Sequence, residues 1–348
     1  MRAGVVLTAT PGVEDLAVRA EELGLDSVWV NDTPMVHGDP FVALSLCAKA
    51  TSRVKLGIGV MSPALRSAPA AASGIASLNA LAPGRIICGV GTGNSARRTL
   101  GMRPTTAAAL ESFTTARQDL CAGRSTEYRE GDRVRDIRFL HDRAHVNTAD
   151  PIEFVVAALL GPKAAAVAGR RGTGLISFGL LDPAAWHALH EARRQAAQGV
   201  PGSRTNSYLV TALHILGEDE DPDGDAARDT TGHLVLSLLT FAADKRAFAA
   251  QLGPAEREAV RRLLDRRGTT ATAPDRHTKL YPNYLGRIAP QDRDLVVPSL
   301  MNMLTLVGTR DDILARINTL EQAGIDELLI QPVVDPPTEM AQLAKLLN

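Results

Sequence analysis

Residues 56–93 read LGIGVMSPALRSAPAAASGIASLNALAPGRIICGVGTG, and this stretch decides the fold. Residues 54–60 and 85–90 are short apolar runs with β-branched side chains, which predicts two buried strands. Residues 68–81 are mostly Ala, Ser and Leu, which predicts a helix between those strands that packs closely on a sheet. Because ligands of parallel α/β folds bind at the carboxyl ends of strands, we expect the active site where these two strands end.

Six further apolar runs alternate with helical patterns along the rest of the chain. They predict strands at 3–7, 25–30, 152–157, 174–178, 208–216 and 327–331. Glycines such as Gly24 and Gly324 end helices directly before strands, as left-handed helix stops do. Eight strands alternating with helices predict an α/β fold of the parallel (β/α)8 TIM-barrel type. A doubly wound open sheet is the alternative, but Gly91-Thr92-Gly93 lacks the third glycine of its dinucleotide-binding fingerprint.

We predict a single domain over residues 1–348 with two insertions. The first is an excursion at 124–150, where charged and apolar residues alternate over 128–139 and predict a solvent-facing hairpin. Helices are predicted at 226–252, 254–267 and 291–303. Between the last two lies the second insertion, the irregular, lid-like segment 268–290, where Tyr281 and Tyr284 are candidates to clamp a substrate.

The composition argues against several classes of partner and site. Lys plus Arg number 38 and Asp plus Glu 39, so the net charge is −1 and we expect no nucleic-acid partner. No apolar run reaches the roughly 18 residues of a membrane span, so we expect no membrane partner. The sparse cysteines Cys47, Cys88 and Cys121 indicate neither disulfides nor a metal site. These cysteines and a start without signal-peptide features predict a cytoplasmic protein.

Several stretches, in the right order along the chain, resemble the bacterial luciferase-like superfamily. Residues 24–32, GLDSVWVND, resemble its second-strand signature, and the central stretch 56–93 is also similar. Further matches are Gly161-Pro162-Lys163 and Val307-Gly308-Thr309. The lean length and the strand end at Asn31-Asp32 look most like the coenzyme F420-dependent oxidoreductases, such as methylenetetrahydromethanopterin reductase and the glucose-6-phosphate dehydrogenase of that type.

This resemblance implies an oxidoreductase that transfers a hydride between the deazaflavin F420 and a small organic substrate. An FMN-dependent monooxygenase, supplied with reduced flavin by a partner reductase, is the first alternative. A barrel that only binds a flavin without catalysis is the second. Relatives are commonly dimers, so we expect a homodimer, for which the apolar helix segments 44–50 and 75–81 are candidate contacts.

The resemblance also implies the site residues. The family's non-proline cis peptide at the end of the third strand matches Gly59–Val60, where a bulge backs the cofactor ring. Asp32 is the candidate catalytic residue, and Gly161 offers backbone N–H groups to the cofactor's phosphodiester. The full set of predicted cofactor-binding residues is Gly59, Val60, Met61, Ser62, Gly91, Thr92, Gly93, Asn94, Arg97, Leu160, Gly161, Pro162 and Phe178.

The sequence departs from the sugar-phosphate-oxidising members of the superfamily. Many of them carry a histidine directly after the aspartate, where this chain has Thr33. A threonine and a lysine that bind phosphate in one branch correspond to Phe178 and Leu181. We therefore predict that the substrate is not a sugar phosphate, and we name His37 as a candidate for proton transfer from the same loop as Asp32.

Each candidate also has a purely structural interpretation. A carboxylate at the position of Asp32 can cap a loop or a helix, and His37 can be an ordinary loop histidine. An arginine at a helix start, such as Arg97, is often simply solvated. Met61 and Phe178 can fill the core rather than line a ring pocket.

Overall fold

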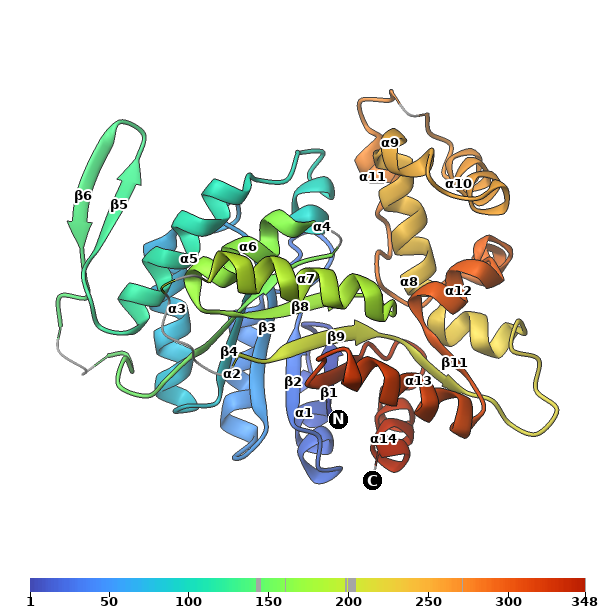
Figure 1. Ribbon diagram of the computed structural model, residues 1–348, viewed down its shortest axis with the longest axis horizontal. Helices are drawn as coiled ribbons and strands as arrows, with labels where there is room; N and C mark the ends of the chain where they lie inside the picture. The colour runs from blue at the N-terminus through green and yellow to red at the C-terminus, as the bar shows by residue number, and fades with distance from the viewer. Residues whose placement is uncertain (142–144, 160, 198, 200–204, 271, 348) are drawn as a thin grey trace.

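The structure, a computed structural model, describes residues 1–141, 145–159, 161–197, 199, 205–270 and 272–347. Eight parallel strands close into a barrel (Figure 1). Their order around the barrel is β1 (Arg2–Leu7), β12 (Glu327–Ile330), β9 (Ser207–Thr211), β8 (Gly174–Phe178), β7 (Glu153–Ala157), β4 (Ile86–Val90), β3 (Lys55–Met61) and β2 (Ser27–Val30). The predicted (β/α)8 barrel is confirmed, and the open sheet is excluded because β1 pairs with both β12 and β2.

Helices cover the outside of the barrel and bury its outward-facing apolar side chains. They are α1 (Val13–Glu22), α2 (Pro40–Ala50), α3 (Ala68–Leu81), α5 (Ala107–Cys121), α6 (Pro162–Arg171), α7 (Pro183–Ala196), α13 (Arg310–Gln322) and α14 (Pro336–Leu347). A separate apolar cluster fills the barrel interior, where the rings of Trp29 and Tyr208 meet edge to face at 5.0 Å. A Cβ added to Gly57 would lie 2.2 Å from the Trp29 ring, so glycine at this strand position makes room for that side chain.

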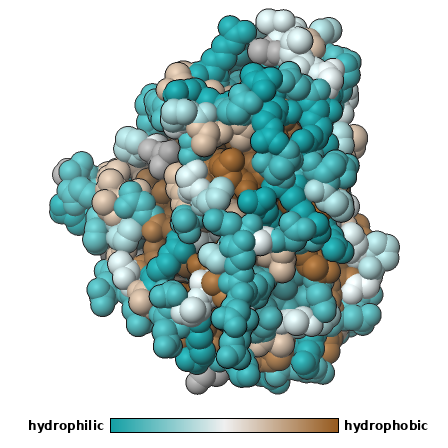
Figure 2. Space-filling view, turned by 90° about the vertical axis from the view of Figure 1, so that its right-hand side faces the viewer, coloured by the Kyte–Doolittle hydropathy of each residue, from teal (hydrophilic) through white to brown (hydrophobic). Residues whose placement is uncertain are grey.

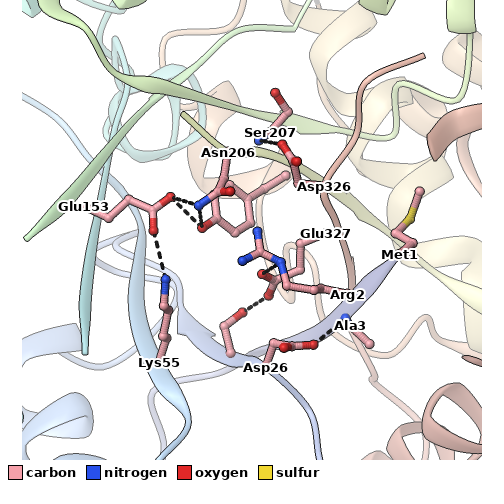
Figure 3. A network of polar contacts seen from close by, with 12 residues as sticks. Met1, Arg2, Ala3, Asp26, Lys55, Glu153, Asn206, Ser207, Asp326 and Glu327 are labelled. Carbon is pink, nitrogen blue, oxygen red and sulfur yellow. Dashed lines mark hydrogen bonds and ion pairs between the residues drawn. The ribbon is translucent and has the colours of Figure 1, made fainter. Parts of the chain in front are cut away.

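Polar side chains close the amino-terminal end of the barrel (Figure 3). Ser27 donates to Glu327, a carboxyl that is 1% exposed and lies 3.5 Å from the Arg2 guanidinium. Tyr208 and Lys55 both bond to Glu153, at 2.7 and 3.2 Å. This network joins the first residues of several strands, an end of the fold where polar contacts contribute stability rather than chemistry.

Two excursions leave the barrel. The predicted hairpin is present as β5 (Thr126–Glu130) and β6 (Arg133–Ile137), which project from the molecule at the left of Figure 1. The second excursion, residues 225–304, is here named the helical insertion. It comprises α8 (Asp225–Asp244), α9 (Arg246–Ala249), α10 (Pro254–Arg266), α11 (Arg276–Leu280), the 3-10 helix η1 (Pro290–Leu295) and α12 (Pro298–Leu304). The helical insertion has an apolar core of its own. In Figure 2, the face shown is mainly hydrophilic, with a hydrophobic hollow below the upper part of the molecule.

Three element predictions are wrong in detail. The strand predicted at 208–216 divides at Ala212, because β9 ends at Thr211 and β10 (Leu213–Ile215) pairs instead with β11 (Leu306–Gly308), a strand that was not predicted. The helix predicted at 226–252 divides near Lys245 into α8 and α9. The helix predicted at 291–303 divides into η1 and α12, because Pro298 begins a new helix. The single-domain assignment and the insertion limits 124–150 and 268–290 stay predictions. Within the described part of the chain, no helix is both long and apolar enough to cross a membrane.

Candidate functional site

The loops that follow the barrel strands form the mouth of the barrel, and the bulge at the end of β3 is its central feature. The peptide bond Gly59–Val60 is cis, as the resemblance implied. The register between β3 and β4 shifts between Ile58 and Met61, which confirms a bulge at this point. A Cβ on Gly89 would lie 2.5 Å from the Ile58 carbonyl oxygen and 2.7 Å from Val60 Cγ1. Gly89, which the sequence analysis did not single out, therefore allows the bulge to pack against β4.

An apolar floor lies beneath the mouth. Val60, Ala157 and Phe178 are half-buried and pack on top of the interior cluster of the barrel. They come from the ends of three strands, β3, β7 and β8. Met61 differs, because its side chain is 0% exposed and belongs to the core between barrel and helices. The prediction that the Met61 side chain lines a ring pocket is therefore not supported, and only its backbone borders the bulge.

The glycine-rich turn after β4 packs tightly on the loop after β3. The Gly91 N–H donates to the Met61 carbonyl at 2.8 Å. Gly93 has φ 78°, and a Cβ there would lie 2.5 Å from Ser62 Oγ. Glycine is therefore required at Gly93 both for its backbone conformation and for the close approach of Ser62. The predicted residues Ser62, Gly91 and Gly93 are thus brought together.

A short helix, α4 (Asn94–Arg98), begins directly after this turn. The side-chain carbonyl of Asn94 accepts a hydrogen bond of 2.9 Å from Arg98 Nε. Arg97 is half-buried, and its Nε donates to the Arg103 carbonyl at 3.1 Å. The Thr92 carbonyl accepts from the backbone and hydroxyl of Thr105, which fixes the turn from its other side. Every predicted residue from Gly91 to Arg97 therefore lies at the mouth.

Asp32 lies two residues beyond the end of β2, on the opposite side of the bulge from β4. Its side chain is buried, and Arg66 Nη2 lies 3.5 Å from Oδ1. Arg66 makes a closer contact, 2.8 Å, with Asp39. Burial raises the pKa of Asp32 from 3.8 to about 6, because the distant Arg66 only partly offsets the lost hydration. The second oxygen, Oδ2, is buried without a hydrogen-bond partner, so it is free to accept a proton or a hydrogen bond from a ligand.

His37 lies on the turn that follows Asp32. Its backbone N–H bonds to the Thr33 carbonyl at 3.0 Å, which closes the turn. Burial lowers the pKa of the imidazole, so the ring is neutral at pH 7. Its Nε2 is buried and has no hydrogen-bond partner, like Oδ2 of Asp32 and Nδ2 of Asn31. These three atoms of one loop have no partner within the described chain, so each is a candidate to bond a ligand.

The predicted phosphodiester site lies at the start of α6. Gly161 is the exposed N-cap of this helix, and Pro162 occupies its first turn. The N–H groups of the next residues are therefore open to an anion, although Pro162 itself donates none. Leu160, also predicted to contact the cofactor, lies outside the described residues.

Two further residues contact the mouth of the barrel. The sequence did not predict the first, Arg66, and predicted the second, Tyr284, only as a candidate clamp. Arg66 was missed because a loop arginine 34 residues beyond Asp32 carries no local signal. Tyr284 of the lid-like segment was proposed as a clamp, and its hydroxyl lies 3.0 Å from Ser95 Oγ on α4. The helical insertion thus reaches across to the glycine-rich side of the mouth.

A comparison with protein families matches residues 6–327 to the family described as luciferase-like monooxygenase. The chain belongs to this family. Among curated relatives of the luciferase-like chain is the F420-dependent glucose-6-phosphate dehydrogenase of Kineococcus radiotolerans, 39% identical over 249 residues, covering 66% of this chain and 70% of the relative. Another is the 5,10-methylenetetrahydromethanopterin reductase of Methanolobus tindarius, 26% identical over 92% of this chain and 90% of the relative.

Solved structures of luciferase-like proteins confirm the fold. An F420-dependent secondary alcohol dehydrogenase in complex with an F420-acetone adduct matches with a TM-score of 0.69 at 17% identity, over 99% of this chain and 97% of that one. The coenzyme F420-dependent tetrahydromethanopterin reductase of Methanopyrus kandleri matches with a TM-score of 0.68 at 19% identity, over the same shares. At these identities the likeness shows a common architecture and no more.

Proposed function

We propose that this protein is an F420-dependent oxidoreductase, with the deazaflavin bound across the barrel mouth. The relatives named above support F420 over FMN, as the sequence resemblance implied. The observation that carries the proposal is the pairing of an apolar floor with an unsatisfied, buried carboxyl at its edge. Val60 and Phe178 suit a flat aromatic ring, and Oδ2 of Asp32 and Nδ2 of Asn31 suit its polar rim.

The residues of the mouth fit this cofactor. The bulge at Gly59–Val60 would support one face of the ring. The turn at Gly91–Gly93 packs closely beside it, since a Cβ on Gly91 would lie 2.9 Å from Val60 Cγ2. The exposed start of α6 at Gly161 suits the anionic tail. When bound, coenzyme F420 supplies the hydride chemistry, and the protein supplies orientation and electrostatics.

Asp32 is the proposed proton-transfer and orienting residue. A carboxyl with a pKa of about 6 populates both its protonated and its ionised form near neutral pH. It can therefore donate a proton from Oδ2 in one direction of the reaction and accept it in the other. His37 is neutral and close in the chain, so it is the proposed second acceptor on this loop. No hydrogen bond joins the two side chains within the part of the chain that the structure describes.

The charges at the mouth favour a substrate without a phosphate group. The Arg66 charge is offset by two carboxylates, Asp32 and Asp39. Arg98 is engaged by Asp244 and Asn94. The end of β8 presents Phe178 followed by Leu180 and Leu181, which offer no donor to an anion. The proposed substrate is therefore a small, uncharged alcohol, carbonyl, imine or unsaturated compound.

Cofactor choice is the experiment that tests the proposal. The purified protein is titrated with F420 and separately with FMN, and the fluorescence of each cofactor is followed. Tight binding of F420 with weak binding of FMN, and turnover of F420 with an uncharged donor or acceptor, is the expected result. Tight binding of FMN alone, with oxygen consumption once reduced flavin is supplied, would replace the proposal with a two-component monooxygenase.

The homodimer and the cytoplasmic location are further parts of the proposal. Leu44 and Ile75, within the helix segments expected to form the contact, face the core and are 0% exposed. Val42, Leu46 and Leu81 are 65%, 44% and 43% exposed, so they supply the apolar surface on α2 and α3 for a second copy. A monomeric mass by light scattering at micromolar concentration would contradict the dimer. Cys47, Cys88 and Cys121 are buried free thiols, which suits a reducing compartment.

A further inference from the structure

The helical insertion contacts α4, the helix that starts at the glycine-rich turn, through two groups of side chains. The hydroxyl of Tyr284 lies 3.0 Å from Ser95 Oγ and 3.2 Å from Ser237 Oγ on α8. It therefore bridges α4 to the core of the insertion. Tyr284 is 9% exposed, so water competes little for these bonds.

The second group centres on Asp244, the last residue of α8. Its carboxylate accepts a hydrogen bond of 2.6 Å from the Tyr281 hydroxyl and also bonds to Arg276. Arg98 Nη1 of α4 lies 3.5 Å from Oδ2 of this carboxylate, the oxygen that accepts from Tyr281. Asp244 is 11% exposed and Arg98 14%, so this charged contact is largely shielded from solvent.

Arg98 transmits this contact to the turn. Its Nε donates to the Asn94 side-chain carbonyl at 2.9 Å, and its Nη1 faces Asp244. Contacts at two of its nitrogens therefore fix the orientation of the guanidinium. The ring of Phe241 lies 5.5 Å from the same guanidinium and limits its movement further. Asp244 thus orients Asn94, one of the predicted cofactor-binding residues, without being adjacent to it in sequence.

The segment beyond α4 is contacted as well. Gly101 has φ 70°, and a Cβ there would lie 2.9 Å from Nδ1 of His277 on α11. The imidazole of His277 therefore sits directly on the loop that follows α4. The insertion contacts Ser95, Arg98 and Gly101 directly, and it reaches Asn94 only through Arg98.

The ring of Tyr284 packs against Tyr281 on one side and borders a cavity of the insertion. This cavity of about 120 Å³ lies between α8, α10 and residues 280–292, and Tyr284 and Ser237 form part of its wall. A ring beside an empty space is held less firmly by its neighbours. The two hydroxyl bonds to Ser95 and Ser237 therefore fix the ring's position.

We propose that Tyr284 and Asp244 are positioning residues that hold α4 and the glycine-rich turn in their cofactor-binding arrangement. The function of this clamp, defined as Tyr284 and Asp244 with their partners Ser95 and Arg98, rests on the proposed F420 binding. α4 has only 5 residues and cannot be stable alone, so without the clamp more of its ordering is left to the cofactor. Pre-ordering by the insertion therefore raises cofactor affinity.

The test compares Asp244→Asn with Asp229→Asn in the full chain. Asp229 is a matched control, since it is 14% exposed, lies on the same helix and bonds Arg293 of η1 through two contacts of 2.6 Å. Asp229 also lies 3.8 Å from Arg287, and among the described residues neither of these arginines bonds to α4. Both variants are expected to lower the melting temperature of the protein. Only Asp244→Asn is expected to raise the Kd for F420, by about tenfold, with kcat at saturating cofactor changed much less.

Hydrogen exchange of the cofactor-free protein supplies a readout that does not depend on the cofactor. The amides of residues 94–101 are expected to exchange faster in Asp244→Asn and in Tyr284→Phe, and at the wild-type rate in Asp229→Asn. Tyr284→Phe keeps the ring and removes only the hydroxyl, so it guards against a folding defect. Unchanged exchange at 94–101 in both clamp variants, or equal effects in Asp229→Asn, would overturn the proposal. Failure of the wild-type protein to bind F420 would count against the proposed function alone.

Discussion

The substitution Asp32→Asn separates the contribution of the buried carboxyl to activity from its effect on the free energy of unfolding. Asp32→Asn keeps the size of the side chain and removes its charge. In the folded protein, burial raises the pKa of Asp32 from 3.8 to about 6. One pKa unit corresponds to about 1.4 kcal/mol, so ionising this carboxyl at neutral pH destabilises the folded state by about 3 kcal/mol.

The sign of the pH dependence follows from proton binding. Between about pH 4 and pH 6 the folded protein keeps a proton on Asp32 that the unfolded chain has released. The free energy of unfolding therefore falls as the pH rises through this window. Near pH 4 the wild type and Asp32→Asn are expected to be about equally stable, because a protonated carboxyl and an amide are both neutral. At pH 7 the variant is expected to be more stable by up to about 3 kcal/mol.

Urea unfolding of the cofactor-free protein at pH 4.5, 6 and 7.5 measures this difference. Activity is expected to change in the opposite direction. Removal of a general acid–base group costs about 10²- to 10⁴-fold in rate, and the limb of the pH–rate profile near pH 6 is expected to disappear. A gain in stability with a loss of turnover would place Asp32 among the strained groups that a functional site retains.

Asp39→Asn is the matched control. Asp39 also contacts Arg66, at 2.8 Å, but its side chain is 43% exposed and caps α2 by accepting from the Phe41 N–H. Asparagine is an equally good N-cap, so this variant is expected to stay within about 1 kcal/mol of the wild type at every pH. The reasoning is refuted if Asp32→Asn shows no gain in stability from pH 4.5 to 7.5, or if its activity and pH profile match the wild type.

Two further substitutions test other parts of the structure. Burial raises the pKa of Glu327 from 4.5 to about 7, so Glu327→Gln is expected to remove a fall in stability of about 3 kcal/mol between those pH values, seen by urea unfolding at pH 5 and pH 8. A slope identical to that of the wild type would contradict this. Gly93→Ala is expected to cost about 1–2 kcal/mol for its left-handed backbone and more for the contact with Ser62, and to weaken F420 binding measured by fluorescence. Gly84→Ala, with φ 70° and nothing within 4 Å of the added Cβ, is its control and is expected to show only the backbone cost.

The sequence predicts the barrel because its strands and helices are marked locally. Apolar runs and the glycines that end helices recur at every unit, and these signals need no knowledge of distant residues. The helical insertion is harder to predict. β10 and β11 are three-residue strands that pair across some 90 residues of intervening chain, so neither carries a periodicity of its own.

The site is predicted in position and less well in chemistry. Asp32 and the turn at Gly91–Gly93 follow strand ends, and the bulge at Gly59–Val60 lies in the last residues of β3. The sequence pattern locates these strand ends, and the family resemblance adds the bulge and the role of Asp32. The partners that set their chemistry come from elsewhere: Arg66 for Asp32, and Asp244 for Asn94 through Arg98. Such contacts depend on loop geometry, and no motif in the sequence marks them.

Strand direction, rather than a perturbed pKa, distinguishes the two buried carboxyls of this barrel. Burial raises the pKa of both Asp32 and Glu327. Glu327 begins β12, where Ser27 donates to it and Arg2 lies nearby, so its environment closes the amino-terminal end of the barrel. Asp32 follows the end of β2, beside the bulge, and its Oδ2 is buried without a hydrogen-bond partner. Because barrel enzymes build their chemistry at the carboxyl ends of strands, we assign Glu327 to stability and Asp32 to the proposed function, although burial shifts both pKa values in the same direction.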